Sequence, residues 1–187
     1  MGRTERSSWL TGLRERRSAR AILDITPHER IIASCQDRDG RVVVATTDAC
    51  VWQAEDGTHR VPWSQIAQAH WVTPILTLRV HVSADTSTDE RGGPPRTVIR
   101  EVDLHLDEPR GVPDAVHACV TESVVFSERI DLDSAAVMLI ARRGTANIET
   151  DGIIWTIAFE SDAAAADPRI AAQAEAALRE VRIALGI

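Results

Sequence analysis

Three alternating residues of one predicted strand have side chains that could bind a metal ion. Asp103, His105 and Asp107 alternate in "DLHLD", so a β-strand would point all three toward the same face of its sheet. Carboxylate and imidazole groups are ligands that zinc accepts. The same alternation places Leu104 and Leu106 on the opposite face, and strand periodicity alone therefore explains the polar triplet. We interpret the triplet as a solvated face and predict no metal site.

Motifs for nucleophilic catalysis and cofactor binding are missing from the sequence. It contains no GxSxG elbow, no phosphate-binding P-loop, no GxGxxG fingerprint and no HExxH pair. His117 and Cys119 are two residues apart on a predicted helix, so they point in different directions. Cys35, Cys50 and Cys119 form no CxxC pair, and we interpret them as buried free thiols. We predict that the protein is not an enzyme and has no cofactor. A deep pocket lined by Asp103, His105 and His117 would favour an enzyme instead.

The charge of the chain is unevenly distributed. The net charge is −7, yet the first 20 residues contain six arginines and only two glutamates, a local charge of +4. The remaining 167 residues therefore have a charge of −11, which repels nucleic acid and anionic membranes. All 21 basic residues are arginine, which indicates a GC-rich coding bias and a high-GC bacterial source.

The basic N-terminal segment contains the candidate partner-binding residues. Trp9, Leu10 and Leu13 would lie on one side of a short amphipathic helix surrounded by arginines. The residues we select are Trp9, Arg14, Arg16, Arg17 and Arg20. Such a segment can contact a protein, or an anionic membrane or RNA. A frayed tail and a helix docked on the acidic body of the same chain are the structural alternatives.

Hydropathy favours a soluble, cytoplasmic protein. The chain has 44% hydrophobic and 26% charged residues, which is ordinary for globular proteins. It has no apolar run of the roughly 20 residues that a membrane span requires. No secretory signal opens the sequence.

The middle of the chain has the periodicity of β-strands. Residues 30–36 and 41–47 predict a hairpin around Asp39-Gly40, and residues 50–53 predict a further strand. Pro62 predicts a strand end or an edge strand, because proline cannot donate a ladder hydrogen bond. Residues 70–82 and 97–107 predict two longer strands, separated by a polar hairpin tip at 83–96.

The stretch "RVPWSQIAQAHW", residues 60–71, contains two of only seven aromatic residues in the chain. "SQIAQA" is too short for a stable helix, so we predict a single turn between two strands. Trp63 and Trp71 would then flank a corner of the sheet and fill the gap that a corner leaves.

The rest of the chain predicts a helix and then a β-β-α unit. Residues 109–126 indicate a helix with Pro113 and Asp114 in its first turn. Residues 135–143 and 153–159 are apolar and typical of strands. The last helix has Asp167 as its N-cap, Pro168 at its first position and Gly186 at its end.

This order of elements resembles a bacterial pleckstrin-homology-like (PH-like) domain. The motifs that support the resemblance are Thr47, Asp48 and Val51, near a T-D-x-x-L step, and Val61, Pro62, Trp63 and Ile66, near I-P-W-x-x-I. The resemblance covers residues 28–126, and the whole chain also resembles a group of actinobacterial proteins without an assigned activity.

The resemblance implies an α+β fold: an antiparallel PH-like β-barrel with a capping helix, followed by the β-β-α unit. The corresponding division is a basic segment at 1–24, a barrel at 25–128 and a C-terminal unit at 129–187. PH-like domains are generally non-catalytic and bind peptides along a strand edge or beside the capping helix. Members that bind phosphoinositides use a basic first loop, but here Asp37 and Asp39 offset Arg38 and Arg41. The resemblance therefore implies an interaction module for another protein, and contact with an anionic surface through the N-terminus is the alternative.

Overall fold

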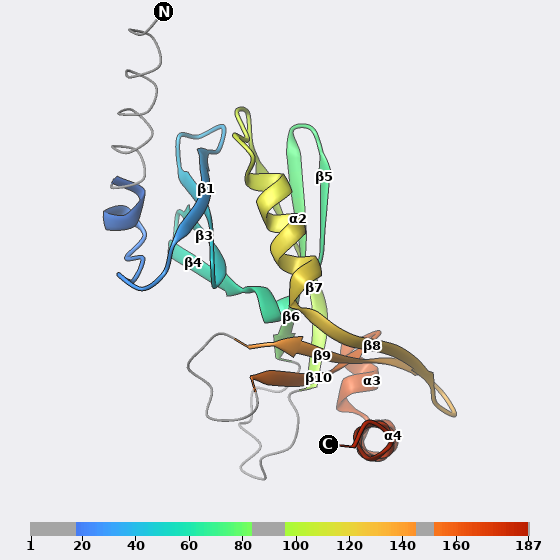
Figure 1. The fold of residues 1–187 in the computed structure, drawn as a ribbon. Helices are drawn as coiled ribbons and strands as arrows, with labels where there is room; N and C mark the ends of the chain where they lie inside the picture. Colours follow the sequence, from blue (N-terminus) through green and yellow to red (C-terminus); the bar gives the residue numbers. More distant parts are fainter. Residues whose placement is uncertain (1–17, 84–95, 145–151, 187) are drawn as a thin grey trace, which may run out of the picture. The chain divides into compact units, whose positions relative to one another are not determined.

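The first four strands form an antiparallel sheet. The computed structural model describes residues 18–83, 96–144 and 152–186. Strands β1 (Ile31–Gln36), β2 (Val42–Thr46), β3 (Ala49–Ala54) and β4 (Gly57–Pro62) pair in chain order (Figure 1). The hairpin predicted for residues 30–47 is confirmed, with Gly40 at φ 77° in its turn, where glycine meets no steric penalty. Pro62 ends an edge strand, as predicted.

A short helical turn at residues 18–22 and the residues after it pack on this sheet. Ala19, Leu23 and Ile25 share one apolar core with Val44 and Val51. Glu29 is buried beside that core, where its carboxylate accepts hydrogen bonds from Thr46 Oγ1 and, at 2.9 Å, from Arg60 Nη2. These contacts fix residues 18–29 against the sheet, because a buried carboxylate is costly unless it keeps its partners.

The chain leaves the first sheet through a 3-10 turn, η1 (Trp63–Gln65). Trp63 is buried, and its indole Nε1 donates to the carbonyl of Thr46 at 3.1 Å. A turn is therefore present next to Trp63, but it is shorter than the predicted "SQIAQA", because Ile66 to Ala69 already belong to the next strand. Trp71 instead lies at the sixth position of the next strand and is half-buried.

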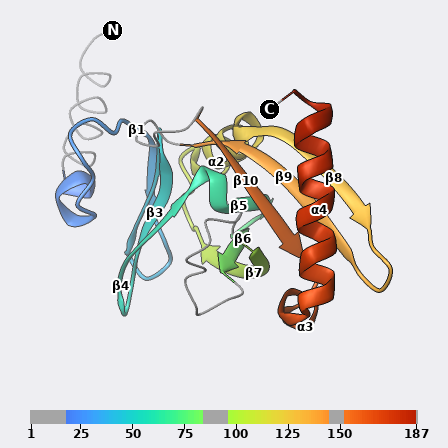
Figure 2. The same cartoon turned by 90° about the horizontal axis from the view of Figure 1, so that it is seen from below.

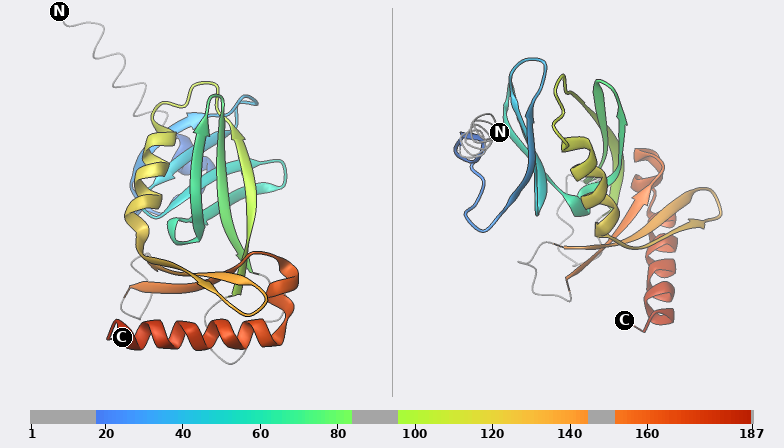
Figure 3. Two further views of the ribbon diagram at one scale, coloured as in Figure 1. Left: turned by 90° about the vertical axis from the view of Figure 1, so that its right-hand side faces the viewer. Right: turned by 45° about the horizontal axis from the view of Figure 1, so that its top comes forward.

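The second sheet contains six strands of the described chain. These are β5 (Ile66–Val72), β6 (Ile75–Ser83), β7 (Arg96–His105), β8 (Val124–Asp131), β9 (Ala136–Arg143) and β10 (Ile153–Phe159). Their order is β5-β6-β7-β10-β9-β8, and Figure 3 shows β5, β6 and β7 side by side. The single strand predicted at 70–82 is wrong. The chain divides at Thr73-Pro74, where proline has no N–H for a ladder.

The pairing within this sheet joins a strand of the predicted barrel to a strand that we had placed in the C-terminal unit. β10 is antiparallel to β9 but parallel to β7, with Ile157 opposite Arg96. The chain between β7 and β10 runs through a helix and two strands, which supplies the long connection that a parallel pair requires. The fold class α+β is confirmed in this form: two sheets, one of them curled, and a few helices.

The helix predicted over 109–126 is shorter than expected. Helix α2 (Val112–Ser123) buries Val112, Val116 and Val120, which are spaced four residues apart. The apolar residues that follow, Val124 to Phe126, begin strand β8 instead, which pairs with β9. β-branched and aromatic side chains favour a pleated sheet, and the pairing with β9 outweighs one further helical turn.

The C-terminal helices follow β10. Helix α3 (Asp162–Ala166) is short, and α4 (Pro168–Ala184) begins as predicted, with the Asp167 carboxylate accepting from the Arg169 N–H at 2.8 Å. Ile170, Ala174 and Leu178 pack in one core with residues of β9 and β10, and Figure 2 shows α4 lying along these strands.

The described chain forms two compact units whose sequences interleave. Unit 1 comprises residues 1–63, 69–77 and 103–119, and unit 2 comprises residues 64–68, 78–102 and 120–187. The domain boundaries that we drew at 24 and 128 stay a prediction. Among the described residues, none of the helices combines the length and the apolar character needed to span a bilayer.

Candidate functional site

The residues predicted to bind a partner fall mostly outside the described chain. Trp9, Arg14, Arg16 and Arg17 are among residues 1–17, which lie outside the described ranges. Arg20 is described and half-buried, and its guanidinium donates to the carbonyls of Thr26 and, at 2.7 Å, of Glu29. Arg20 thus stabilises the position of residues 26–29 relative to the helical turn. Its role in partner binding stays a prediction.

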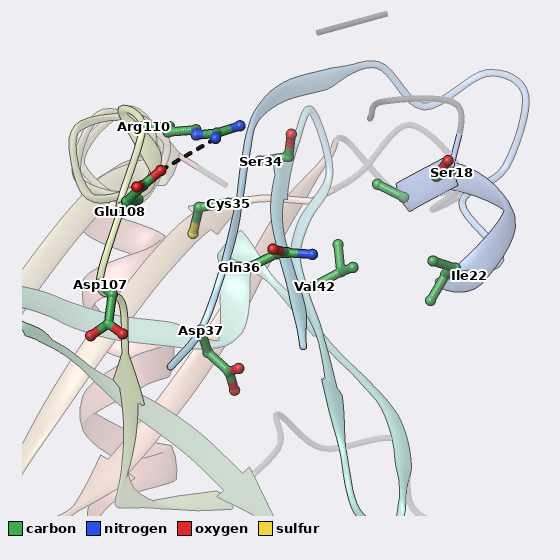
Figure 4. A pocket seen from close by; sticks show the side chains of 11 residues that line it. Ser18, Ile22, Ser34, Cys35, Gln36, Asp37, Val42, Asp107, Glu108 and Arg110 are labelled. Carbon is green, nitrogen blue, oxygen red and sulfur yellow. Dashed lines mark hydrogen bonds and ion pairs between the residues drawn. The ribbon is translucent and has the colours of Figure 1, made fainter. Parts of the chain in front are cut away.

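An open pocket of about 550 Å³ lies in unit 1. Three chain segments form it: the helical turn at 18–22, the end of β1 with the start of β2, and the loop between β7 and α2. The lining residues are Ser18, Ala19, Ile22, Ser34, Cys35, Gln36, Asp37, Val42, Asp107, Glu108 and Arg110. In Figure 4, Ser18 and Ile22 lie on one side, and Asp107, Glu108 and Arg110 lie on the other. The volume lies in the range of small-ligand and peptide side-chain sites.

The lining of the pocket is acidic. The lining includes three carboxylates, Asp37, Asp107 and Glu108, and one guanidinium, Arg110, which gives it a formal charge of −2. Arg110 Nη2 lies 3.3 Å from Glu108 Oε2, and both side chains are largely exposed. Asp37 also shapes the β1–β2 turn, because its Oδ1 accepts from the N–H groups of Asp39 and Arg41. Carboxylates of one sign around a hollow attract cations from solution.

The loop that presents two of these carboxylates is held in a fixed conformation. The Leu106 N–H donates to the carbonyl of Pro74 at 2.8 Å, and the Val112 N–H donates to that of Pro109 at 2.8 Å. Arg110 has φ 42° and Gly111 has φ 80°, two successive residues in the left-handed region. An arginine in this region costs roughly 1 kcal/mol, which the helix start at Val112 and the bonds around it must offset.

The cysteine in the pocket is not an activated nucleophile. Burial, aided by the negative charge of Asp37, raises the pKa of the Cys35 thiol to about 12. Cys50 is fully buried, and burial raises the pKa of its thiol to about 12 as well. A thiol attacks as its thiolate, so neither of these cysteines is activated at neutral pH. Cys35 and Cys50 are buried free thiols, as predicted, whereas Cys119 is only half-buried.

The polar residues that suggested metal or acid–base chemistry are not gathered at the pocket. Asp103 Oδ1 accepts from Thr77 Oγ1 at 2.6 Å, while Asp107 lines the pocket beyond the end of β7. Asp103, His105 and His117 are not among its lining residues. Within the described ranges, no group of three or more His, Cys, Asp or Glu side chains is close enough to hold a metal ion.

Unit 2 contains a buried cation at the end of α2. Arg142 is 3% exposed; its Nη1 donates to Ser123 Oγ at 2.6 Å and to the Val120 carbonyl at 3.3 Å, and its Nη2 donates to the Ala67 carbonyl at 3.0 Å. In a flat sheet β5 and β9 would lie about 19 Å apart, four strand spacings. The contact with Ala67 therefore requires the sheet to curl. The Arg142 side chain is therefore enclosed within unit 2 and does not form part of a charged surface.

His81 lies near this cation in the same unit. It is 5% exposed, and its Nδ1 lies 3.2 Å from Thr97 Oγ1. Burial, together with the positive charge of Arg142, lowers the pKa of His81 to about 4. The imidazole is therefore neutral at physiological pH, and the pair is a structural feature of the curled sheet.

Sequence reasoning missed the pocket because its residues are dispersed. Asp37 belongs to a turn that we judged only as a failed phosphate-binding loop, and Asp107, Glu108 and Arg110 lie in the "LDEPRG" connection that we assigned to a strand end and a helix start. The available signal was the excess of acidic residues outside the first 20 positions. Comparisons of the chain with protein-family models, curated proteins and solved structures found no match.

Proposed function

We propose that this protein is a non-catalytic cytoplasmic interaction module that binds an arginine- or lysine-rich segment of another protein in the acidic pocket of unit 1. The observation that supports this proposal most is the pocket itself: about 550 Å³, with three carboxylates and a single guanidinium on its lining. Ile22 and Val42 add apolar surface that the aliphatic part of an arginine or lysine side chain can cover.

The finer fold assignment belongs to the same proposal. A PH-like origin for the chain from 28 to 126 is supported by the buried positions of Trp63 and Ile66, the two apolar anchors of the motif. It is also supported by a helix, α2, that follows seven strands. PH-like domains use their scaffold for binding, and the chemistry of this pocket suits a cationic peptide better than an anionic lipid headgroup.

Neutralising two pocket carboxylates is expected to weaken binding of a basic peptide about tenfold. The variant is D107N/E108Q, and the probe is a fluorescein-labelled (Arg-Ser)₄ peptide measured by fluorescence anisotropy at low salt. Exposed ion pairs contribute about 0.2–1 kcal/mol each, so losing two costs roughly 1.4 kcal/mol, a factor of ten. The matched control is E122Q/E128Q, which changes the net charge equally at exposed sites outside the pocket lining. Equal affinities for the two variants would refute the proposal.

Replacing the pocket arginine is expected to have the opposite effect. Arg110→Gln removes the positive charge from the lining and leaves Glu108 without its 3.3 Å ion-pair partner. The formal charge of the lining becomes more negative by one, and we expect the same peptide to bind about threefold tighter. Arg143→Gln, an exposed change on β9, is the control for net charge. Weaker binding of the basic peptide by Arg110→Gln would contradict the proposal that the negative charge of the lining attracts the ligand.

A further inference from the structure

The pocket lies next to Ser18, the residue at which the basic residues 1–17 join the described chain. Ser18, Ala19 and Ile22 form part of its lining, so the residue preceding Ser18 is attached directly to its edge. Residues 1–17 contain five arginines and two glutamates, a net charge of +3, and Arg14, Arg16 and Arg17 are the nearest of them to the pocket in sequence. The charge of the pocket lining is of the opposite sign.

Building on the proposed function, we infer that the acidic pocket is an autoinhibitory site, in which Arg14, Arg16 and Arg17 of the same chain compete with the basic segment of the partner. The distance is short: Arg14 is four residues from Ser18, a span of at most about 14 Å when extended. The helical turn at 18–22 is fixed by the apolar core and by the Arg20 hydrogen bonds, so it holds the end of the segment at the edge of the pocket, across from Asp107 and Glu108 (Figure 4).

Tethering makes even a weak contact effective. A segment attached by a few residues has an effective concentration of about 1 mM at its site. If the free segment bound with a Kd of about 0.1 mM, the tethered one would occupy the pocket about 90% of the time. An outside peptide would then bind about tenfold more weakly, because only the unoccupied fraction is competent to bind it. A partner must therefore offer either more cationic contacts or additional apolar ones.

The test uses the full chain and the same (Arg-Ser)₄ peptide. We expect R14Q/R16Q/R17Q to bind this peptide about tenfold tighter than the wild type, because the internal competitor has lost its charges. The control R143Q/R169Q/R182Q changes the net charge equally at exposed positions of unit 2, and we expect less than a twofold change. In the D107N/E108Q background, the gain from R14Q/R16Q/R17Q is expected to vanish.

The outcomes separate this inference from the proposed function. If D107N/E108Q weakens peptide binding but R14Q/R16Q/R17Q binds no tighter than its control, the pocket binds basic segments and the autoinhibition is wrong. In the R14Q/R16Q/R17Q background, where the internal competitor has lost its charges, D107N/E108Q is expected to weaken peptide binding about tenfold. Unchanged binding in that background would show that both the proposed function and the autoinhibition are wrong. A gain that appears only at high protein concentration, together with dimers in sedimentation, would assign the segment to a second copy and overturn competition within one chain.

Discussion

Replacing Arg142 with methionine is expected to lower the free energy of unfolding by about 3 kcal/mol. The guanidinium is the hydrogen-bond donor for Ser123 Oγ and for the carbonyls of Val120 and Ala67. Each buried polar group that loses its partner costs about 1–3 kcal/mol. The gain from no longer burying a charge offsets part of that sum. The effect is expected because this one side chain joins β9 to the end of α2 and to β5.

Urea unfolding followed by circular dichroism measures this change. The matched control is Arg143→Met, the exposed neighbour on the same strand, for which we expect a change within about 0.5 kcal/mol. Arg142→Lys keeps the charge but cannot reach three separated acceptors. Its free energy of unfolding is therefore expected to lie between those of Arg142→Met and Arg143→Met. Wild-type stability in Arg142→Met would contradict the role assigned to this residue.

Between pH 7 and pH 4, the wild type is expected to lose about 3 kcal/mol more unfolding free energy than the variant His81→Gln. Burial and the charge of Arg142 lower the pKa of His81 from 6.5 to about 4. The unfolded chain therefore binds a proton at His81 below about pH 6.5, whereas the folded chain binds it only near pH 4. Stability from the neutral imidazole is complete above pH 6.5 and declines as the pH falls, by about 1.4 kcal/mol per unit of pKa difference.

The comparison between variants isolates this imidazole, because carboxylates titrate in all of them. Unfolding free energies are measured by urea denaturation from pH 7 to pH 4 for the wild type, His81→Gln and His70→Gln. His70 is exposed on β5, so its variant is expected to follow the wild-type curve. Parallel curves for wild type and His81→Gln would show that the imidazole is not kept neutral by the fold.

Local periodicity predicted those parts of the fold in which one face is buried. The hairpin at 30–47, the edge position of Pro62 and helix α4 with its Asp167 cap all follow from turn chemistry, alternation or capping within a few residues. The boundary between α2 and β8 could not be found this way. Val124 lies four residues after Val120, where the next buried position of the helix would fall. Only its pairing with β9, which is distant in sequence, places it in a strand.

Neither the parallel pairing of β7 with β10 nor the pocket could be predicted from local sequence patterns. Both bring together residues far apart in sequence: Thr97 pairs with Ala158, and Asp37 lines the same pocket as Asp107. Single carboxylates in separate loops have no period, so their convergence shows only in three dimensions. The net charge of the body was the sole indication in the sequence of the cationic ligand that we propose.

Amide chemical-shift mapping shows directly whether a basic peptide binds in the acidic pocket of unit 1. The ¹⁵N-labelled full chain is titrated with the (Arg-Ser)₄ peptide, with (Glu-Ser)₄ as the reference for nonspecific effects. We expect saturable changes in amide chemical shift, concentrated at residues 34–37, 107–111 and 18–22, with the basic peptide and not with (Glu-Ser)₄. Shifts spread evenly over acidic residues of both units, or confined to residues outside these three segments, would contradict binding in this pocket.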